Sequence, residues 1–320
     1  MNLRILLCVL LAAGWAVARA AEPAPSPPLA GMAPRSVALS SDLVHVAGSD
    51  MLQTAIGEPL TRYAQDARLK VKVDLQGSMP ALSGLKAGKI QLAILTAPLG
   101  QPPAPKEFKV IPLCFAVDYI IVNQANPLNV LDLRQLSSVF GLSEQGGMTW
   151  GTLQVGADWA ARPIVPCSTS TDDGLVIEIF KNEILGGNAL KPTVRILNTA
   201  REMVKTIVDN PNAIGLGGYD PGAPCKVVQI STTSSAASAA VSSGSAKGAA
   251  HPTPEAVFSG DYPLRLPFYL VYKAADKASV LPLLRLLLSD EYAARLQAEH
   301  FVPVPDTERN RARLELDNPD

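Results

Sequence analysis

Residues 42–99 constrain the fold most, because two strand–turn–helix units follow one another there and a third strand comes after them. The predicted strands are short apolar runs at 43–47, 71–75 and 90–95. In the first unit the apolar residues that follow the strand recur closer to the helical period of 3.6 residues than to the strand period of two. Strands that alternate with helices at this spacing predict parallel βαβ units. The chain is therefore expected to build an α/β fold.

A polar turn follows each of these strands. The turns supply Gly48, Ser49 and Asp50 after the first strand, Gly77 and Ser78 after the second, and Thr96 after the third. Ser78 is expected to cap the second helix, with Pro80 at its first position. Ligands of open parallel sheets bind beyond the C-terminal ends of the strands. We therefore expect Ser49, Ser78 and Thr96 to converge at a binding cleft; the alternative is that the two serines only cap their helices.

Residues 1–20 have the form of a secretory signal peptide. Arg4 precedes the apolar run Ile5–Val17, and Ala18-Arg19-Ala20 fits the small-x-small rule for cleavage. The run is shorter than the roughly 20 residues that a membrane-spanning helix needs. Cys8 lacks the preceding small residue that a lipid-modified cysteine requires. We expect cleavage after Ala20 and export to the periplasm.

The charge balance of the remaining chain is close to neutral. Cleavage would remove two of the 28 basic residues and leave 26 against 29 acidic residues, a net charge of −3. Such a balance gives no support for nucleic-acid binding, which usually needs a basic face. The length suits one large or two medium domains. Residues 21–41, rich in Pro and Ala, are expected to form a loose leader, and residues 231–250, rich in Ser and Ala, a surface loop.

Three cysteines remain after cleavage: Cys114, Cys167 and Cys225. An exported compartment permits one disulfide among them and leaves one thiol over, and the sequence does not choose the pair. Their spacing does not fit a zinc site and the three histidines are scattered, so no metal or cofactor is expected. Cys167 is expected to be disulfide-bonded or buried and inert rather than reactive.

Two segments are expected to cross between two lobes. Residues 108–122 form either one long strand or two strands joined end to end, with the crossing at 116–119, and residues 226–230 are expected to return the chain. The first lobe would then be discontinuous. The predicted ranges are 42–117 plus 224–320 for the first lobe and 118–223 for the second.

The second lobe repeats the strand–turn–helix theme over residues 163–187. A run of hydroxyl and acidic residues, from Ser168 to Asp173, precedes a predicted helix at 175–185. Helix capping alone explains most such clusters, and Asp172 and Asp173 are expected to serve as cap and dipole partners. Trp150 and Trp159 are expected to be packing residues rather than walls of the cleft.

In this order and at these distances, the chain resembles the type II periplasmic binding proteins, specifically the phosphate-binding family of ABC transporters. The matching segments are VAGSDM (46–51), GSMPALSGLKAGKIQLAI (77–94), 111–128, Trp150 with the Ser/Thr loop that follows, 213–215, DYPLRLPFYL (261–270) and 301–303. The resemblance covers about Val44 to Val304. It implies a two-lobed fold with a ligand cleft between lobes that a two-segment hinge joins. It also implies an oxyanion held by hydroxyls and by N–H groups at helix N-termini.

Carried over by position, the resemblance implies the following ligand-binding residues: Gly48, Ser49 and Asp50 on the first loop, Gly77 and Ser78 on the second, Thr96 on the third, and Ser168, Ser170 and Thr171 on the second-lobe wall. It implies phosphate or a related small oxyanion as ligand, an ABC transporter permease as partner, a monomer, and no enzymatic activity.

Two departures from the family pattern weaken the expected phosphate chemistry. Thr96 stands where the phosphate binders place an aspartate, and Val165-Pro166-Cys167 stands where they place an arginine. Asp172 and Asp173 would repel a dianion unless they point away. Because a hydrogen bond to a charged group is worth roughly 1.5–3 kcal/mol, loss of the arginine predicts phosphate affinity weaker by about one to two orders of magnitude.

Three classes of function follow from these residues. The first is a solute-binding protein for an oxyanion. The second is a family member whose cleft has drifted and that acts as a periplasmic sensor or protein-interaction module without phosphate binding. The third is an exported enzyme, which is disfavoured because neither Gly-x-Ser-x-Gly nor His-Glu-x-x-His occurs.

Overall fold

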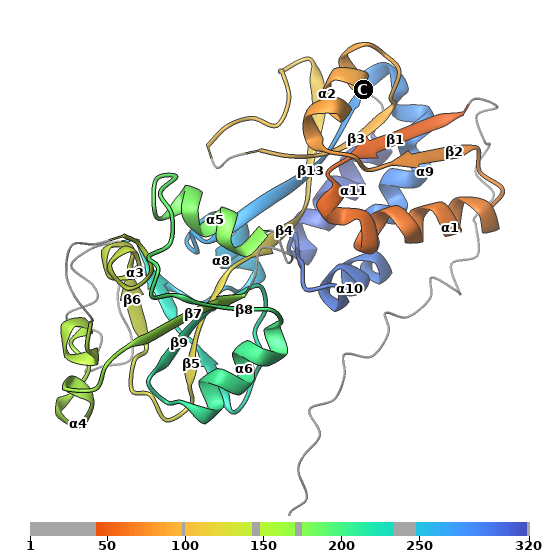
Figure 1. Cartoon of the computed structure of the whole chain (residues 1–320). Helices are drawn as coiled ribbons and strands as arrows, with labels where there is room; N and C mark the ends of the chain where they lie inside the picture. The colour runs from red at the N-terminus through yellow and green to blue at the C-terminus, as the bar shows by residue number, and fades with distance from the viewer. Residues whose placement is uncertain (1–42, 98–99, 143–147, 170–174, 233–247, 319–320) are drawn as a thin grey trace, which may run out of the picture.

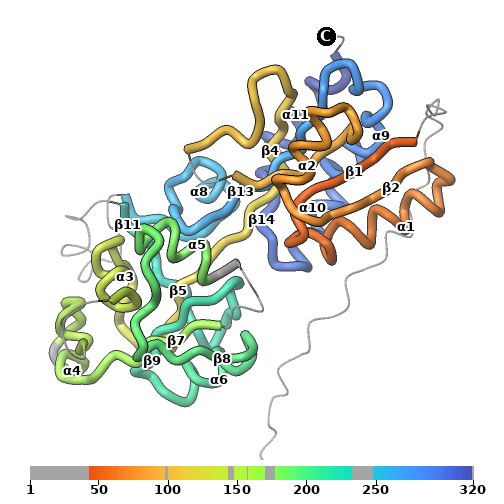
Figure 2. The backbone as a smooth tube through the Cα atoms, turned by 45° about the horizontal axis from the view of Figure 1, so that its top comes forward, coloured from red at the N-terminus to blue at the C-terminus, as the bar shows by residue number. Residues whose placement is uncertain are grey.

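The computed structural model describes residues 43–97, 100–142, 148–169, 175–232 and 248–318. The described chain forms two lobes, which lie at opposite ends of an elongated molecule (Figures 1 and 2). One lobe contains a six-stranded sheet. The other contains a five-stranded sheet, whose core it shares with a small three-stranded sheet.

Parallel pairing of the first three strands organises the six-stranded sheet. Its strands in spatial order are β14 (Val302–Pro303), β4 (Phe108–Val117), β13 (Arg265–Lys273), β3 (Leu92–Thr96), β1 (Val44–Gly48) and β2 (Val71–Asp74). β1 pairs in parallel with both β2 and β3, which confirms the predicted βαβ units. The helical segments of this lobe are η1 (Asp50–Leu52), η2 (Gln53–Gly57), α1 (Glu58–Asp66), α2 (Ser78–Lys86), η5 (Ala274–Asp276), α9 (Lys277–Leu287), α10 (Asp290–Ala298) and α11 (Asp306–Asp317).

The second lobe is also built on a mixed sheet. Its five-stranded sheet has the order β10 (Cys225–Val227), β5 (Tyr119–Asn123), β9 (Ala213–Gly217), β7 (Val165–Thr169) and β8 (Arg195–Leu197). The three-stranded sheet has the order β12 (Ala249–Ala250), β11 (Gln229–Ser231) and β6 (Val130–Asp132). The helices are α3 (Leu133–Phe140), η3 (Trp150–Leu153), α4 (Ala157–Ala160), α5 (Leu175–Glu183), α6 (Ala200–Asp209) and α8 (Pro254–Ser259).

The continuous apolar sequence of β3 is explained by burial on both of its faces. Leu92 and Ile94 belong to one buried cluster, whereas Ala93 and Leu95 belong to another on the opposite face. All four are at most 1% exposed. A strand covered on both faces needs no polar alternation, which is typical of parallel α/β sheets.

The apolar run at 108–122 forms two strands end to end, one of the two expected arrangements. β4 ends at Val117 in the six-stranded sheet, and β5 begins at Tyr119 in the five-stranded sheet. Asp118 alone lies between them. β13 pairs antiparallel with β4 along its whole length, and the two strands run side by side toward the second lobe (Figure 1).

The chain returns to the six-stranded sheet later than the expected 226–230. β10 pairs with β5 and β11 pairs with β6, so both remain in the second lobe's sheets. The apolar run at 225–231 is broken at Val228, whose N–H donates to the Ile120 carbonyl, and each half joins a different sheet. The strand that runs back is β13, which begins at Arg265.

The three cysteines are free and buried, so the permitted disulfide is not formed. Burial raises the pKa of Cys114 above its usual range and that of Cys167 to about 12, which keeps both thiols protonated and unreactive. Trp150 is fully buried and meets Trp159 edge-on at 6.0 Å between ring centroids, as expected of packing residues.

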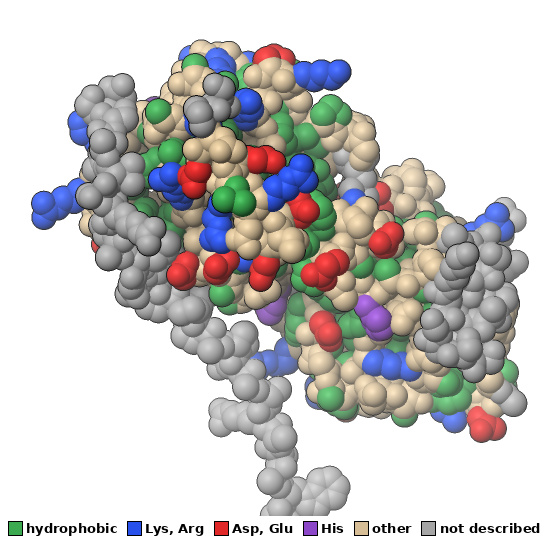
Figure 3. Space-filling model, turned by 180° about the vertical axis from the view of Figure 1, so that it is seen from behind, with side chains coloured by type: hydrophobic (Ala, Val, Ile, Leu, Met, Phe, Trp, Pro, Cys, Tyr) green, Lys and Arg blue, Asp and Glu red, His purple; other side chains and the backbone are tan. Residues whose placement is uncertain are grey.

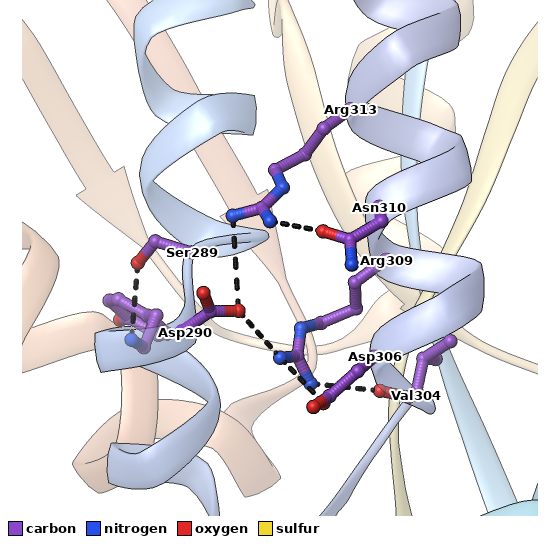
Figure 4. A network of polar contacts seen from close by, with 8 residues as sticks. Ser289, Asp290, Val304, Asp306, Arg309, Asn310 and Arg313 are labelled. Carbon is purple, nitrogen blue, oxygen red and sulfur yellow. Dashed lines mark hydrogen bonds and ion pairs between the residues drawn. The ribbon is translucent and has the colours of Figure 1, made fainter.

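An arginine cluster ties the last two helices together (Figure 4). Arg309 of α11 is 4% exposed, and its guanidinium contacts the carboxylates of Asp290 and Asp306 at 2.8 Å each. It also donates to the Val304 carbonyl at 3.1 Å. Hydrogen bonding to Arg309 lowers the pKa of Asp290 below its usual value. The buried guanidinium therefore holds α10, α11 and the end of β14 in register.

Substitution of Arg309 should be far more destabilising than loss of an exposed ion pair on the same helix. We expect Arg309→Met to lower the free energy of unfolding by about 1–3 kcal/mol, because the Val304 carbonyl loses its donor and both carboxylates lose their close contact with the buried guanidinium. Arg311→Met, which removes the exposed pair with Glu315, should change it by less than about 1 kcal/mol. Urea unfolding of both variants measures the difference, and equal effects would contradict the assigned role of Arg309.

Candidate functional site

The C-terminal ends of β1 and β3 and the turn after β2 meet at one edge of the six-stranded sheet. The Gly77 N–H donates to the Gly48 carbonyl at 2.7 Å, and the Ser49 N–H donates to the Ile94 carbonyl at 2.9 Å. The Ser78 hydroxyl accepts from the Thr96 N–H at 3.1 Å. The three predicted turns are thus joined by hydrogen bonds. The structure brings together Gly48, Ser49, Asp50, Gly77, Ser78 and Thr96, the first-lobe residues that the sequence predicts.

The second helix begins earlier than predicted. Its N-cap is Gly77, with φ +126° and ψ 152°, and Ser78 is the first helical residue. Pro80 is therefore the third helical residue, and Ser78 is not a cap. A φ of +126° is accessible to glycine but strained for any residue with a Cβ. The glycine frees the Ser78 hydroxyl to bond β3 instead.

The N–H groups at this edge differ in whether they are available to bind a ligand. The N–H groups of Ser49 and Gly77 are already bonded to carbonyls. Ser78 and Met79 lie in the first turn of α2, where N–H groups have no acceptor within the helix, and Pro80 has no N–H to offer. An anion at the start of α2 would therefore be met by the N–H groups of Ser78 and Met79, the positive end of the α2 dipole and the Ser78 hydroxyl. Asp50 and Met51 lie in the first turn of η1, where N–H groups also have no acceptor within the helix.

Thr96 is committed to the neighbouring strand. Its hydroxyl donates to the Pro267 carbonyl of β13 at 2.8 Å. The proton of this hydroxyl is therefore engaged, and only the oxygen lone pairs can meet a ligand. Thr96 can accept a hydrogen bond from a protonated oxyanion, but it brings no charge.

In the second lobe, Ser168 and Thr169 lie at the C-terminal end of β7 and are 0% and 1% exposed. Ser168 donates to the Thr169 carbonyl at 3.3 Å. Within the described chain, the Thr169 hydroxyl has no hydrogen-bond partner. Ser170, Thr171, Asp172 and Asp173 fall outside the described residues.

Sequence reasoning did not single out Arg195. It lies on β8, where its backbone is in register with that of Cys167, and its charge lowers the pKa of the Cys167 thiol while burial raises it more. Arg195 therefore lies beside β7, a strand whose own sequence contains no basic residue. Only the pairing of β7 with β8 reveals the proximity, because 28 residues separate the two positions.

Helix α5 contacts the cores of both lobes. Phe180 packs edge-on against Phe140 in the second lobe's core, with 5.3 Å between ring centroids. The preceding residue, Ile179, belongs to the cluster of the six-stranded sheet. α5 lies between the lobes in Figures 1 and 2, and its contacts with both cores join the lobes in addition to the connecting strands.

Residues 25–291 match the family model of the PBP superfamily domain. The chain belongs to this superfamily of periplasmic binding proteins. It is 24% identical over 217 residues to the phosphate-binding protein PstS of Pseudomonas aeruginosa, an alignment that covers 64% of this chain and 63% of that protein. The match therefore spans a little less than two thirds of the length of the relative.

Solved structures of low sequence identity share the fold. A possible phosphate-binding protein from Planctomyces limnophilus superimposes with a TM-score of 0.64 at 19% identity, covering 86% of this chain and 98% of that one. PstS from Borrelia burgdorferi gives 0.63 at 15% identity, over 82% and 99%. An ABC-type phosphate transport receptor from Vibrio cholerae gives 0.57 at 19% identity, over 82% and 99%. These likenesses confirm the predicted two-lobed type II fold.

Two further features bear on the classes of function. Among the described residues, no helix is long and apolar enough to span a membrane, and no group of three or more metal-ligating side chains occurs. Lysine and arginine side chains are interspersed with aspartate and glutamate on the face that Figure 3 shows.

The positive φ of Gly77 can be tested directly by substituting a residue that has a Cβ. We expect Gly77→Ala to lower the free energy of unfolding by about 1–3 kcal/mol, because φ +126° is strained once a Cβ is present. Gly156→Ala is the matched control: Gly156 also precedes a helix, but it has φ −52° and open space around an added Cβ. Thermal and urea unfolding should show little effect there. An unchanged Gly77→Ala variant would contradict the conformation described for this turn.

Proposed function

We propose that this protein is a solute-binding protein that captures phosphate or a related small oxyanion between its lobes. It would be exported to the periplasm after cleavage of residues 1–20. There the monomeric protein would deliver its ligand to an ABC transporter in the membrane. The similarity to proteins named as phosphate-binding supports this proposal. The observation that carries it is the convergence of three polar turns at one sheet edge, joined by the hydrogen bonds from Gly77 to Gly48 and from Thr96 to Ser78.

The donors at this edge are dipoles rather than charges. No lysine or arginine occurs in the segments 48–52, 77–81 and 96–97 that form it. The α2 N-terminus supplies two N–H groups and a positive dipole end, and Ser78 adds a hydroxyl. Such a set favours a small anion and fixes its position. Without a bidentate cation, we expect it to bind phosphate more weakly than a site that has one.

The second-lobe wall is proposed to complete the site. Ser168 and Thr169 end β7, and Ser170 and Thr171 follow them in the sequence. The buried Thr169 hydroxyl, which has no partner in the described chain, is suited to a ligand or an ordered water. The lobe ranges proposed from the sequence need one change, because the observed return strand begins at Arg265.

The Ser78 hydroxyl provides the sharpest test of ligand binding. We expect Ser78→Ala to weaken phosphate affinity about 10- to 150-fold, since a hydrogen bond to a charged group contributes roughly 1.5–3 kcal/mol. Calorimetric titration of ligand-stripped protein measures the change, with sulfate, molybdate, phosphonates and small organic acids as further titrants. Ser83→Ala is the control, because Ser83 is an exposed serine farther along the same helix.

The outcomes separate the candidate functions. Tight binding of one anion that Ser78→Ala weakens and Ser83→Ala does not would support the proposed site. Binding that both variants retain in full would place the ligand elsewhere. If the folded wild-type protein binds none of the anions, the solute-binding function is contradicted and the sensor or interaction module is favoured.

A further inference from the structure

The two connections between the lobes are bonded to each other at one residue. Asp118 is the single residue between β4 and β5, and its N–H donates to the Leu264 carbonyl at 3.0 Å. Its own carbonyl accepts from the Tyr262 hydroxyl at 2.7 Å. Tyr262 and Leu264 belong to the segment that leads into β13. Both main-chain groups of Asp118 therefore tie the outgoing connection to the returning one.

The side chain of Asp118 is buried without a full set of partners. The residue is 1% exposed, and its Oδ2 atom has no hydrogen-bond partner among the described residues. Native proteins pair nearly all buried polar groups, so an orphaned carboxyl oxygen in a hinge calls for a physical explanation. An ionised carboxylate there would lack both water and a counter-ion, which is very unfavourable.

The titratable groups around Asp118 do not supply a compensating charge. Tyr119 follows it in β5, and Tyr262 faces it from the other connection; burial first, and then Asp118, raises the pKa of Tyr262. Asp220, after β9, adds negative charge near Tyr119. Arg265, at the start of β13, is directed to the end of α8, where it donates to the Val257 and Phe258 carbonyls. Burial accordingly raises the pKa of Asp118 well above its usual range.

We propose that Asp118 is a proton-controlled hinge residue: uncharged in the lobe arrangement seen here, and ionised in an arrangement that lets water reach the hinge. On ionisation the carboxylic O–H bond breaks and the proton passes to water, with no other reactant. Rising pH then favours the hydrated arrangement by mass action, by at most tenfold per pH unit while one proton is released. The inference goes beyond ligand capture and holds whichever anion binds.

The same linkage fixes how stability depends on pH. Since the folded-state pKa of this acid is raised, the folded chain keeps a proton that the unfolded chain loses near its ordinary value of about 3.9. The stability due to this group is therefore greatest at low pH and is lost as pH rises from that value through the folded-state pKa. Asp118→Asn, neutral at every pH, should abolish that loss and be more stable than the wild type at pH 8.

Interlobe distance is the direct readout. Probes attached through Lys89→Cys and Arg201→Cys would report it, since both positions are exposed and lie on different lobes. Cys114, Cys167 and Cys225 are buried and would stay unlabelled in the folded protein. In the absence of any ligand, we expect the wild-type distance to change between pH 4.5 and 8.5, and Asp118→Asn to keep the low-pH distance throughout.

Asp261→Asn is the matched control, because Asp261 is an exposed carboxylate at the second connection that bonds Ser259. In this variant the interlobe distance should change with pH as it does in the wild type. An Asp118→Asn variant that follows the wild-type profile, or a wild-type distance that does not change with pH, would overturn the proposal. If Asp118→Asn fails to fold, the ¹³Cγ resonance of Asp118 in the wild type decides. A protonated carboxyl above pH 5 supports the proposal, and an ordinary aspartate titration overturns it.

Discussion

The antiparallel pairing of β4 with β13 is the constraint on which the rest of the structure depends. The ladder runs from Arg265 opposite Val117 to Lys273 opposite Phe108, so it begins at the hinge and extends along the whole of both strands. β3 pairs with the other side of β13, and β14 with the other side of β4. The orientation of the hinge is therefore fixed by the same sheet that positions Ser49, Ser78 and Thr96.

This ladder tolerates two prolines because it is irregular where they occur. Pro112 of β4 and Pro267 of β13 cannot donate to a sheet, and the register shifts between Phe268 and Tyr269, which leaves Leu113 out of the pairing. The Leu113 carbonyl then accepts from the Val304 N–H, and the Pro267 carbonyl accepts from Thr96. The irregularity thus ties in the C-terminal segment on one side and the candidate site on the other.

The sequence predicted those elements that depend only on neighbouring residues, such as the period of apolar residues and the residue types of turns. The βαβ units and the polar turns that converge at their strand ends follow from hydrophobic period and turn chemistry. The same pattern left open whether residues 108–122 form one strand or two, and placed the crossing only within 116–119. The return strand was placed wrongly because 225–231 and 265–273 are both apolar and extended, and only pairing partners tell them apart. Arg195 was missed for the same reason, since register between strands carries no signal in a single strand. The position of the Ser78 hydroxyl depended on a positive φ at Gly77, which spacing does not encode.

A hinge and a binding site that share one sheet have coupled energetics. A ligand that stabilises the contact between the lobes opposes any free-energy contribution that favours hydration of the hinge. Ionisation of the buried Asp118 carboxyl is such a contribution. A site that binds an anion through N–H dipoles alone releases its ligand more readily than one built on a buried cation, because the donors hold it less strongly. A protonatable hinge adds a second control, independent of the donors, over the same equilibrium between lobe arrangements. If the proposed site binds an anion, the departures from the phosphate-binding pattern and the buried Asp118 would act on two separate terms of one equilibrium: the contacts with the ligand and the conformation that makes those contacts possible.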